Sequence, residues 1–483
     1  MKKSELAQTL FALRAEQLKE LKRFADSDLV NRGSRRIHVA ALLRHLMRLH
    51  PDAEQEGLLQ ANVWKALFGK KDFDKSELSK IASDALAVVK EFIIQEEHSR
   101  TAEIDRLLLL AQFYYEKDLD KFYKQTAAEI RRKLDTANLP DRWSHLESFR
   151  LEELQIEQEA KFYVRKEDPS LPAAITHIQL FYLLSKIRLC CILATHNQIA
   201  SSSIESDWLI TDEFLIKSCE HIPAVNIWLT AFKMFKSGDE ADFLRLCELM
   251  DEYQGNMSFH DLFELASYLR LFCNRKFLAS GEQAVLHQLF GLQAKHLERG
   301  YLQIENGKIP QSTLLNLVSV GIKLKRFPEV EKALATVGSN IIGADTPDRT
   351  LALNRALLAF AQGKIAEAHE IIPSHDFEDV QYQIVCRVLW MKIWYETDEL
   401  DRLESEINTF RVYVHRACEE KKIITPARKE VNFAFLRFLS SLLKFKFTRP
   451  RDQILEKIAE LNEKKTVADR DWLLEKMENL LKR

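Results

Sequence analysis

The feature that most constrains the fold of this chain is a helix–turn–helix pattern, clearest in the stretch AFAQGKIAEAHEII. Ala352, Ala356 and Ala359 are spaced four and three residues apart, so they share one helix face and allow a second helix to approach closely. Gly363 follows, and glycine favours a helix end because it adopts the left-handed backbone conformation without steric cost. Ile365 then restarts the apolar spacing. The stretch therefore predicts a helical hairpin.

Similar hairpins recur along the sequence. The order of small-residue face, glycine turn and second helix resembles the tetratricopeptide unit, a repeated helical hairpin. Comparable stretches turn near Leu119, Ala241, Phe277, Phe327, Ile365, Leu400 and Phe447. From Ala241 onward the turns are 36, 50, 38, 35 and 47 residues apart, an irregular period that is typical of degenerate repeats. We therefore expect an all-α, tetratricopeptide-like α-solenoid of stacked helical hairpins, with a non-repeating helical bundle as the alternative.

Composition supports helices nearly throughout. Glycine and proline number 13 and 11 in 483 residues, so residues that end helices are scarce. Alternating strand patterns are almost absent. The segment Tyr301–Ile309 could form one small hairpin at Asn306-Gly307, although a loop is the simpler interpretation.

Three regions are expected from these patterns. Residues 1–100 form an N-terminal helical region outside the repeat, residues 101–450 form the degenerate hairpin solenoid, and residues 451–483 form a C-terminal capping helix pair. The cap is predicted because terminal repeats need a polar outer face. Its two apolar stripes are Ile454, Leu455, Ile458 and Leu461, followed by Trp472, Leu473, Met477 and Leu480.

A family resemblance rests on residues of the N-terminal region. The shared positions are Phe24, Leu67-Phe68, Phe73, Leu78, Ser83-Asp84 and Glu91-Phe92. With these residues, the segments Glu20–Pro51 and Val63–Ile93 resemble the opening of a family of long, helical, functionally uncharacterised proteins of Bacteroidota. The usual Pro-Tyr-Phe-Asn stretch is replaced by DLVNRGSRR. The resemblance covers about the first hundred residues and implies no known activity.

No motif for catalysis, a cofactor or a metal is present in the sequence. Phosphate-binding glycine loops, H-E-x-x-H and G-x-S-x-G are all missing. His38, His45 and His50 are close in sequence, but no cysteine or carboxylate completes a ligand set. Cys190 and Cys191 are adjacent on a predicted helix, so they point in different directions and are expected to be buried thiols. We therefore expect no catalytic, cofactor-binding or metal-binding residues and a protein that is not an enzyme.

Charge is unevenly distributed although the net charge is only −2. Residues 203–270 are net −8, residues 1–50 are net +6 and residues 415–451 are net +7. Basic patches at 32–48 and 437–451 are therefore candidate partner-binding surfaces. Their tentative contact residues are Arg35, Arg36, Arg437, Lys444, Lys446, Arg449 and Arg451. Phenylalanines interleave with the second patch, which also permits single-stranded nucleic acid. Phe435 and Phe438, three residues apart, instead fit a core stripe.

The leading hypothesis is a protein-interaction scaffold that receives a protein or peptide partner in the groove of the solenoid. A nucleic-acid-binding protein that uses the two basic patches is the alternative. No membrane span is expected, because Lys186 and Arg188 interrupt the most apolar helix, His177–Ala200, which we predict to be buried. The seven cysteines include no C-x-x-C pair, which together with the absence of a signal peptide indicates reduced thiols in the cytoplasm.

Overall fold

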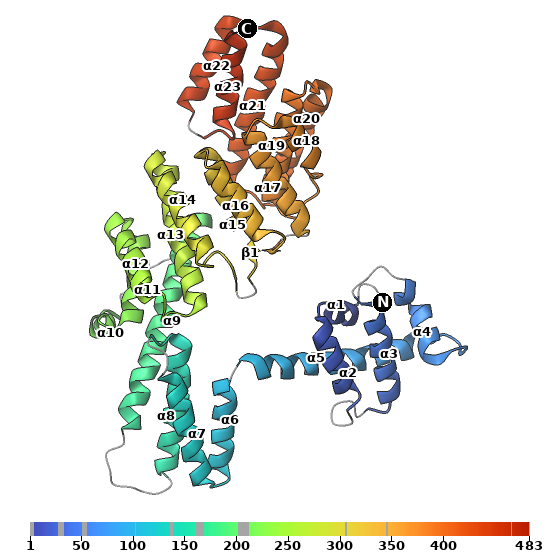
Figure 1. Ribbon diagram of the computed structural model, residues 1–483, viewed down its shortest axis with the longest axis vertical. Coiled ribbons are helices and arrows are strands. Elements are labelled where there is room, and N and C mark those ends of the chain that lie inside the picture. Colours follow the sequence, from blue (N-terminus) through green and yellow to red (C-terminus); the bar gives the residue numbers. More distant parts are fainter. Residues whose placement is uncertain are drawn as a thin grey trace. The chain divides into compact units, whose positions relative to one another are not determined.

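The computed structural model describes residues 4–27, 33–50, 56–101, 103–135, 139–160, 169–200, 212–304, 307–343, 346–464 and 466–482. This part of the chain is all-α, as predicted, with 23 α-helices (Figure 1). Its one short sheet pairs β1 (Ile309–Pro310) with β2 (Ile341–Ile342) in parallel, with Ile309 opposite Ile341. Ile309 therefore pairs with a distant segment and not across a hairpin at Asn306, which lies outside the described residues.

Contacts divide the chain into two units, residues 1–181 and 182–483, and we describe each by itself. Unit 1 contains α1 (Glu5–Phe11), α2 (Ala15–Ala25), α3 (Arg36–Leu49), the 3-10 turn η1 (Glu56–Leu58), α4 (Gln60–Phe68), α5 (Lys75–Thr101), α6 (Glu103–Glu116), α7 (Asp120–Leu134), α8 (Arg142–Ala160) and the first part of α9 (Ser170–Ala200). Unit 2 contains the rest of α9, α10 (Glu213–Cys219), α11 (Pro223–Ser237), α12 (Glu240–Tyr253), α13 (Phe259–Ser280), α14 (Gln283–Glu298), α15 (Gln311–Lys323), α16 (Phe327–Val337), α17 (Pro347–Ala361), α18 (Ile365–Ile371), α19 (Val380–Glu396), α20 (Leu400–Glu419), α21 (Pro426–Thr448), α22 (Arg451–Glu463) and α23 (Arg470–Lys482).

Among the residues that the structure describes, two hydrophobic clusters lie in unit 1. The first joins α1 to α5, and all its buried members lie between Leu6 and Phe92. The second joins α6, α7 and α8, where Tyr123 and Ile130 are buried against Leu151. The region boundaries predicted at residues 100 and 450 stay predictions.

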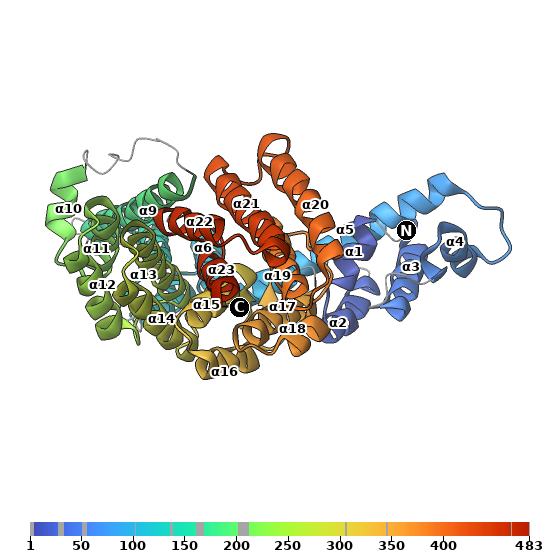
Figure 2. The same cartoon turned by 90° about the horizontal axis from the view of Figure 1, so that it is seen from above.

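Unit 2 is built from helical hairpins that follow one another in chain order (Figures 1 and 2). The pairs α11/α12, α13/α14, α15/α16, α17/α18 and α19/α20 are each joined by a short connection, and most helices pack against the next one or two helices in the sequence. A hairpin buries only one stripe of each helix internally, so the neighbouring hairpin must cover the remaining apolar surface.

Most predicted turns lie where second helices begin. The helices α16, α18 and α20 begin at Phe327, Ile365 and Leu400, and α7 and α12 begin within one residue of Leu119 and Ala241. These positions were predictable because a helix end and a polar turn precede each of them. Gly363, for example, has a φ of 79°, a conformation that favours glycine over other residues.

Two predicted turns lie a few residues before the observed helix ends. Phe277 lies inside α13, which continues to Ser280 because nothing between these residues ends a helix. The turn comes at Gly281, where the φ is 70°. Phe447 lies inside α21 by one residue, since the last residue of this helix is Thr448. Arg449 follows in the left-handed conformation, immediately before Pro450.

Helix α9 is buried on one face only, so the prediction of a buried helix is only partly correct. Leu183, Ile187 and Cys191 are fully buried, whereas Leu189 is 60% exposed. Within the described residues one helical segment, Ser170–His196, is long and apolar enough to span a membrane, and 33% of its most apolar window is buried.

Both charges within this apolar helix have carboxylate partners in unit 2. Lys186 pairs with Asp212, and Arg188 Nε donates to a Glu264 carboxylate oxygen at 2.6 Å. All four side chains are at most 20% exposed. The ion pairs therefore fix this part of α9 against α13 and the segment before α10.

The C-terminal helices α22 and α23 complete unit 2. Helix α23 packs on α21 and α22. It also contacts α19 through side chains. Lys392 of α19 pairs with Asp469 at 2.5 Å, and the indole Nε1–H of Trp472 donates to a Glu396 carboxylate oxygen at 3.0 Å. The Lys392 ammonium also lies 4.7 Å from the ring centre of Phe360 in α17 and 5.7 Å from that of Trp472 in α23, so its contacts join three helices.

Candidate functional site

In the first basic patch, Arg35 has partners inside unit 1. Its guanidinium donates from Nε to Glu77 at 2.8 Å and from Nη1 to Asp84 at 3.1 Å, which joins the start of α3 to α5. These hydrogen bonds raise the pKa of Arg35. Arg36 is exposed at the first residue of α3. Arg35 therefore has a structural role, and the binding roles of both residues stay predictions.

The cations of the second patch face different parts of unit 2. Lys446 faces α19, where its Nζ donates to the Tyr395 carbonyl oxygen at 3.0 Å and pairs with Asp398. The ammonium also lies 4.4 Å from the centre of the Tyr395 ring. Arg449 ends α21 with a φ of 43°, and Arg451 is exposed at the first residue of α22. None of these three residues lines the cavity described next.

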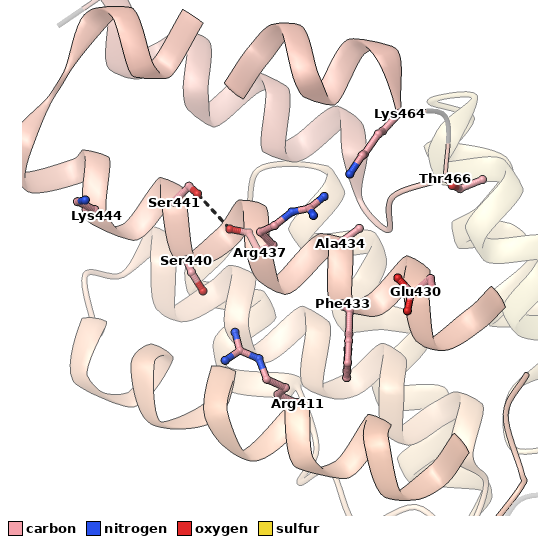
Figure 3. A pocket seen from close by; sticks show the side chains of 10 residues that line it. All are labelled: Arg411, Glu430, Phe433, Ala434, Arg437, Ser440, Ser441, Lys444, Lys464 and Thr466. Atoms are coloured by element: carbon pink, nitrogen blue, oxygen red, sulfur yellow. Dashed lines mark hydrogen bonds between the residues drawn. The ribbon is translucent and has the colours of Figure 1, made fainter. Parts of the chain in front are cut away.

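Arg437 and Lys444 lie on a different face of α21, and that face lines a cavity of about 770 Å³ (Figure 3). The lining residues on α21 recur every three to four residues, with two adjacent pairs at 433/434 and 440/441, so they form one broad helical face. The walls come from α20 and from the connection between α22 and α23. We call this cavity the α21 groove. Its lining residues are Arg411, Glu430, Phe433, Ala434, Arg437, Ser440, Ser441, Lys444, Lys464 and Thr466.

Cations from three elements meet at one carboxylate beside the groove. Glu460 accepts from Lys457 at 2.5 Å, pairs with Arg437 at 3.2 Å and pairs with Lys464 at 3.4 Å. The pKa of Glu460 is lowered, mainly by the hydrogen bond from Lys457. Because one carboxylate neutralises only one of these three charges, positive charge is in excess here.

Two further cations add to this excess. Arg411 and Lys444 are exposed, and among the residues that the structure describes neither makes an ion pair. The only acid among the lining residues is Glu430, at one end of the α21 face. The groove is therefore suited to an anionic ligand, and its charges are held at the surface where water and salt screen them.

The floor of the groove is fixed by contacts within unit 2. The Phe433 ring is half-buried against the C-terminal hydrophobic cluster and lies 5.6 Å from the Lys429 ammonium. The Ser440 hydroxyl donates to the Leu436 carbonyl oxygen, and the Ser441 hydroxyl donates to the Arg437 carbonyl oxygen (Figure 3). Both hydroxyls are therefore committed to the helix backbone. The polar recognition groups of the groove are thus mainly its cations.

Sequence reasoning found only part of the groove. Arg437 and Lys444 were predicted, whereas Arg411, Lys464 and Glu460 were missed. The missed residues come from α20, α22 and the connection after α22, and only tertiary packing brings them to α21. Local spacing therefore carried no signal for them.

The three histidines singled out by the sequence do not converge. His38 stacks on Phe68 with ring centres 4.6 Å apart, and His45 Nε2 lies 3.2 Å from the Gly57 carbonyl oxygen. His50 instead contacts the Phe11 ring. Across the described ranges, no group of three or more histidine, cysteine, aspartate or glutamate residues is arranged to hold a metal ion.

The cysteine pair lacks the surroundings of a reactive thiol. Cys190 and Cys191 are both buried, and burial raises the pKa of each thiol. Cys191 Sγ contacts the Trp228 carbonyl oxygen at 3.9 Å. Nucleophilic cysteines have a lowered pKa, so both residues are structural.

A histidine pair in unit 1, of which His145 is buried and His177 half-buried, had no sequence signal, because its members are 32 residues apart. His145 Nδ1 of α8 lies 3.1 Å from His177 Nδ1 of α9, which is a hydrogen bond when one nitrogen carries the proton. Burial lowers the pKa of His145 to about 4 and also lowers that of His177. Nearby, burial raises the pKa of Glu147 to about 7. The pair favours neutral imidazoles.

No family model, curated protein or solved structure matches this chain significantly.

Proposed function

We propose that this protein is a non-catalytic protein-interaction scaffold of the α-solenoid type, and that the α21 groove receives a segment of its protein partner. The observation that carries the proposal is the α21 groove itself. Arg437 and Lys444 of α21, Arg411 of α20 and Lys464 after α22 surround its cavity. Helical-repeat proteins commonly bind extended segments in such grooves, because a row of helices offers a long concave surface.

The surroundings of the groove support binding better than chemistry. Its floor holds two hydroxyls that are already hydrogen-bonded, and it contains no histidine or cysteine among its lining residues. General acid–base or nucleophilic catalysis needs a positioned acid, base or nucleophile near a reacting atom. We place the protein in a reducing compartment such as the cytoplasm, since all seven cysteines are free thiols in the structure.

Site-specific photo-crosslinking in native extract tests the proposal. A photoreactive residue replaces Ser440 inside the groove, and a matched one replaces Lys332, which is exposed on α16. We expect a discrete protein adduct from position 440 only. The adduct should disappear in an Arg411→Glu, Arg437→Glu variant with an unchanged circular dichroism spectrum. The absence of a groove-dependent adduct would reject the proposed function.

Nucleic acid is the second candidate ligand, because the half-buried Phe433 ring lies among cations that could contact phosphates. A gel shift with single-stranded oligonucleotides at several salt concentrations tests this alternative. A nucleic-acid-binding protein should lose affinity steeply as salt rises, and neutralising Arg36 and Lys444 should reduce the slope. Equal, weak shifts for wild type and variant would exclude these patches as a nucleic-acid surface.

A further inference from the structure

We infer that the occupant of the α21 groove is an acidic peptide segment, and that Glu460 competes with its carboxylates for Arg437 and Lys464. This inference rests on the proposed function and specifies the partner's chemistry. It follows from the residues beside the groove, where the protein's own carboxylate already occupies the position that a ligand carboxylate would take.

Glu460 shows how this site holds a carboxylate. Its Oε1 lies 3.2 Å from Arg437 Nη2 and 3.4 Å from Lys464 Nζ, and both cations also line the groove. The Glu460 side chain is 29% exposed, so a ligand carboxylate can approach the same cations from solvent. Binding of a ligand carboxylate would therefore weaken the ion pairs that Glu460 makes with Arg437 and Lys464.

The spacing of the cations selects an extended segment. Arg437 and Lys444 are seven residues apart on α21, which corresponds to about 10 Å along a helix axis. In an extended segment of polyproline II geometry, side chains three residues apart share one face and are separated by about 9 Å. Acidic residues at every third position would therefore match both cations, while Arg411 faces the segment from α20.

The opposite end of the groove has different chemistry. Phe433 and Ala434 offer apolar surface there, and Glu430 repels a further acid. The segment should therefore carry an apolar side chain at this end and its acids toward Lys444. This polarity gives the groove a preferred direction of binding.

The same carboxylates disfavour nucleic acid. A phosphate backbone carries a negative charge at every nucleotide, so it would bring charges against both Glu430 and Glu460. A peptide carries its charges only where the sequence provides them, and it avoids both positions. Charge complementarity thus favours a peptide with separated acids.

Fluorescence anisotropy with the full-length protein tests the inference at low salt. The probe is a labelled ten-residue peptide with one leucine followed by glutamates at every third position. The controls are the same peptide with glutamine for glutamate and a labelled ten-nucleotide oligo(dT). We expect binding of the glutamate peptide only, and a loss of affinity as salt is raised.

Two variants test whether Glu460 competes with the peptide carboxylates for the cations of the groove. Glu460→Gln should strengthen peptide binding roughly fivefold, because it removes a like charge from the site, and Arg437→Gln should weaken binding by a similar factor. Lys332→Gln removes one exposed charge from α16 and should change the affinity less than about twofold, as expected for a distant, screened charge. Circular dichroism checks that each variant folds.

Three outcomes would overturn the inference: no binding of the glutamate peptide, equal binding of the glutamine peptide or the oligonucleotide, or no gain from Glu460→Gln. If a groove-dependent crosslink forms at position 440 while this test fails, the groove binds a protein segment that is not acidic. Absence of the crosslink instead rejects the proposed function itself.

Discussion

Replacement of Gly321 by alanine should destabilise the protein although alanine is the better helix former. Gly321 lies in the last turn of α15, where α14 and α16 pack closely against it. A Cβ atom at this position would lie 2.2 Å from Val330 Cγ2 and 2.8 Å from Phe290 Cε2. Carbon atoms in contact are normally about 3.5–4.0 Å apart, so Val330 would have to move by more than about 1 Å.

The magnitude follows from two opposing effects. Alanine gains about 1 kcal/mol over glycine in a helix interior. Forcing an extra group into a packed core costs about 1–3 kcal/mol, and the contact with fully buried Val330 places Gly321→Ala at the upper end. We therefore expect a net loss of about 1–2 kcal/mol in the free energy of unfolding.

The assay is urea unfolding followed by circular dichroism at 222 nm, with hydrogen exchange of α14, α15 and α16 to locate the change. Local exchange matters because a chain of this length need not unfold in one step. Gly291→Ala is the matched control, since Gly291 is exposed within α14 and no atom lies within 4 Å of an added Cβ. This control should stabilise by up to about 1 kcal/mol.

A double variant sharpens the test. Val330→Ala removes the atom that the new methyl group meets, so Gly321→Ala should cost less in the Val330→Ala background, with a coupling of at least about 1 kcal/mol. If Gly321→Ala stabilises the protein as Gly291→Ala does, α14, α15 and α16 do not approach as described.

Two further predictions concern charge. Because burial lowers the pKa of His145 to about 4, the unfolded chain binds more protons than the folded one below its ordinary pKa of 6.5. The unfolding free energy should therefore fall by about 3 kcal/mol between pH 6.5 and pH 4 because of this group. Glu147, whose pKa is raised to about 7, acts in the opposite direction, so the comparison is with His145→Gln, which should lose less stability in urea unfolding over this range. The second prediction concerns Asp469→Asn. Asparagine tolerates the φ of 47° at this position, but the substitution leaves buried Lys392 without its carboxylate partner. It should cost about 1–2 kcal/mol and speed hydrogen exchange in α23, whereas unchanged exchange would contradict the contact.

The sequence predicted the helices and most hairpin turns because those signals are local. Helical spacing, scarce glycine and proline, and polar turns act within a few residues, and Ile365 and Leu400 mark helix starts correctly. The core stripe was also readable, since Phe435 and Phe438 are both fully buried. The turn near Phe277 failed because the actual signal, Gly281, lies four residues further on.

The groove could be predicted only in part, because it depends on which helix face its neighbours leave uncovered. Lys444 and Lys446 are two residues apart, so they point to nearly opposite sides of α21. The sequence carries cations on both sides and does not indicate which side α19 covers. Arg411 and Lys464 join Lys444 only through tertiary packing.

The contact of Lys446 with α19 has a practical consequence for mapping the binding surface. In an alanine scan of the basic patch at 437–451, we expect Lys446→Ala to reduce binding. This substitution removes the hydrogen bond to the Tyr395 carbonyl oxygen and so disturbs the packing of α21 on α19. That loss would be a false positive of the scan. Substitution of Lys444, which the fold does not require, reports on ligand contact alone.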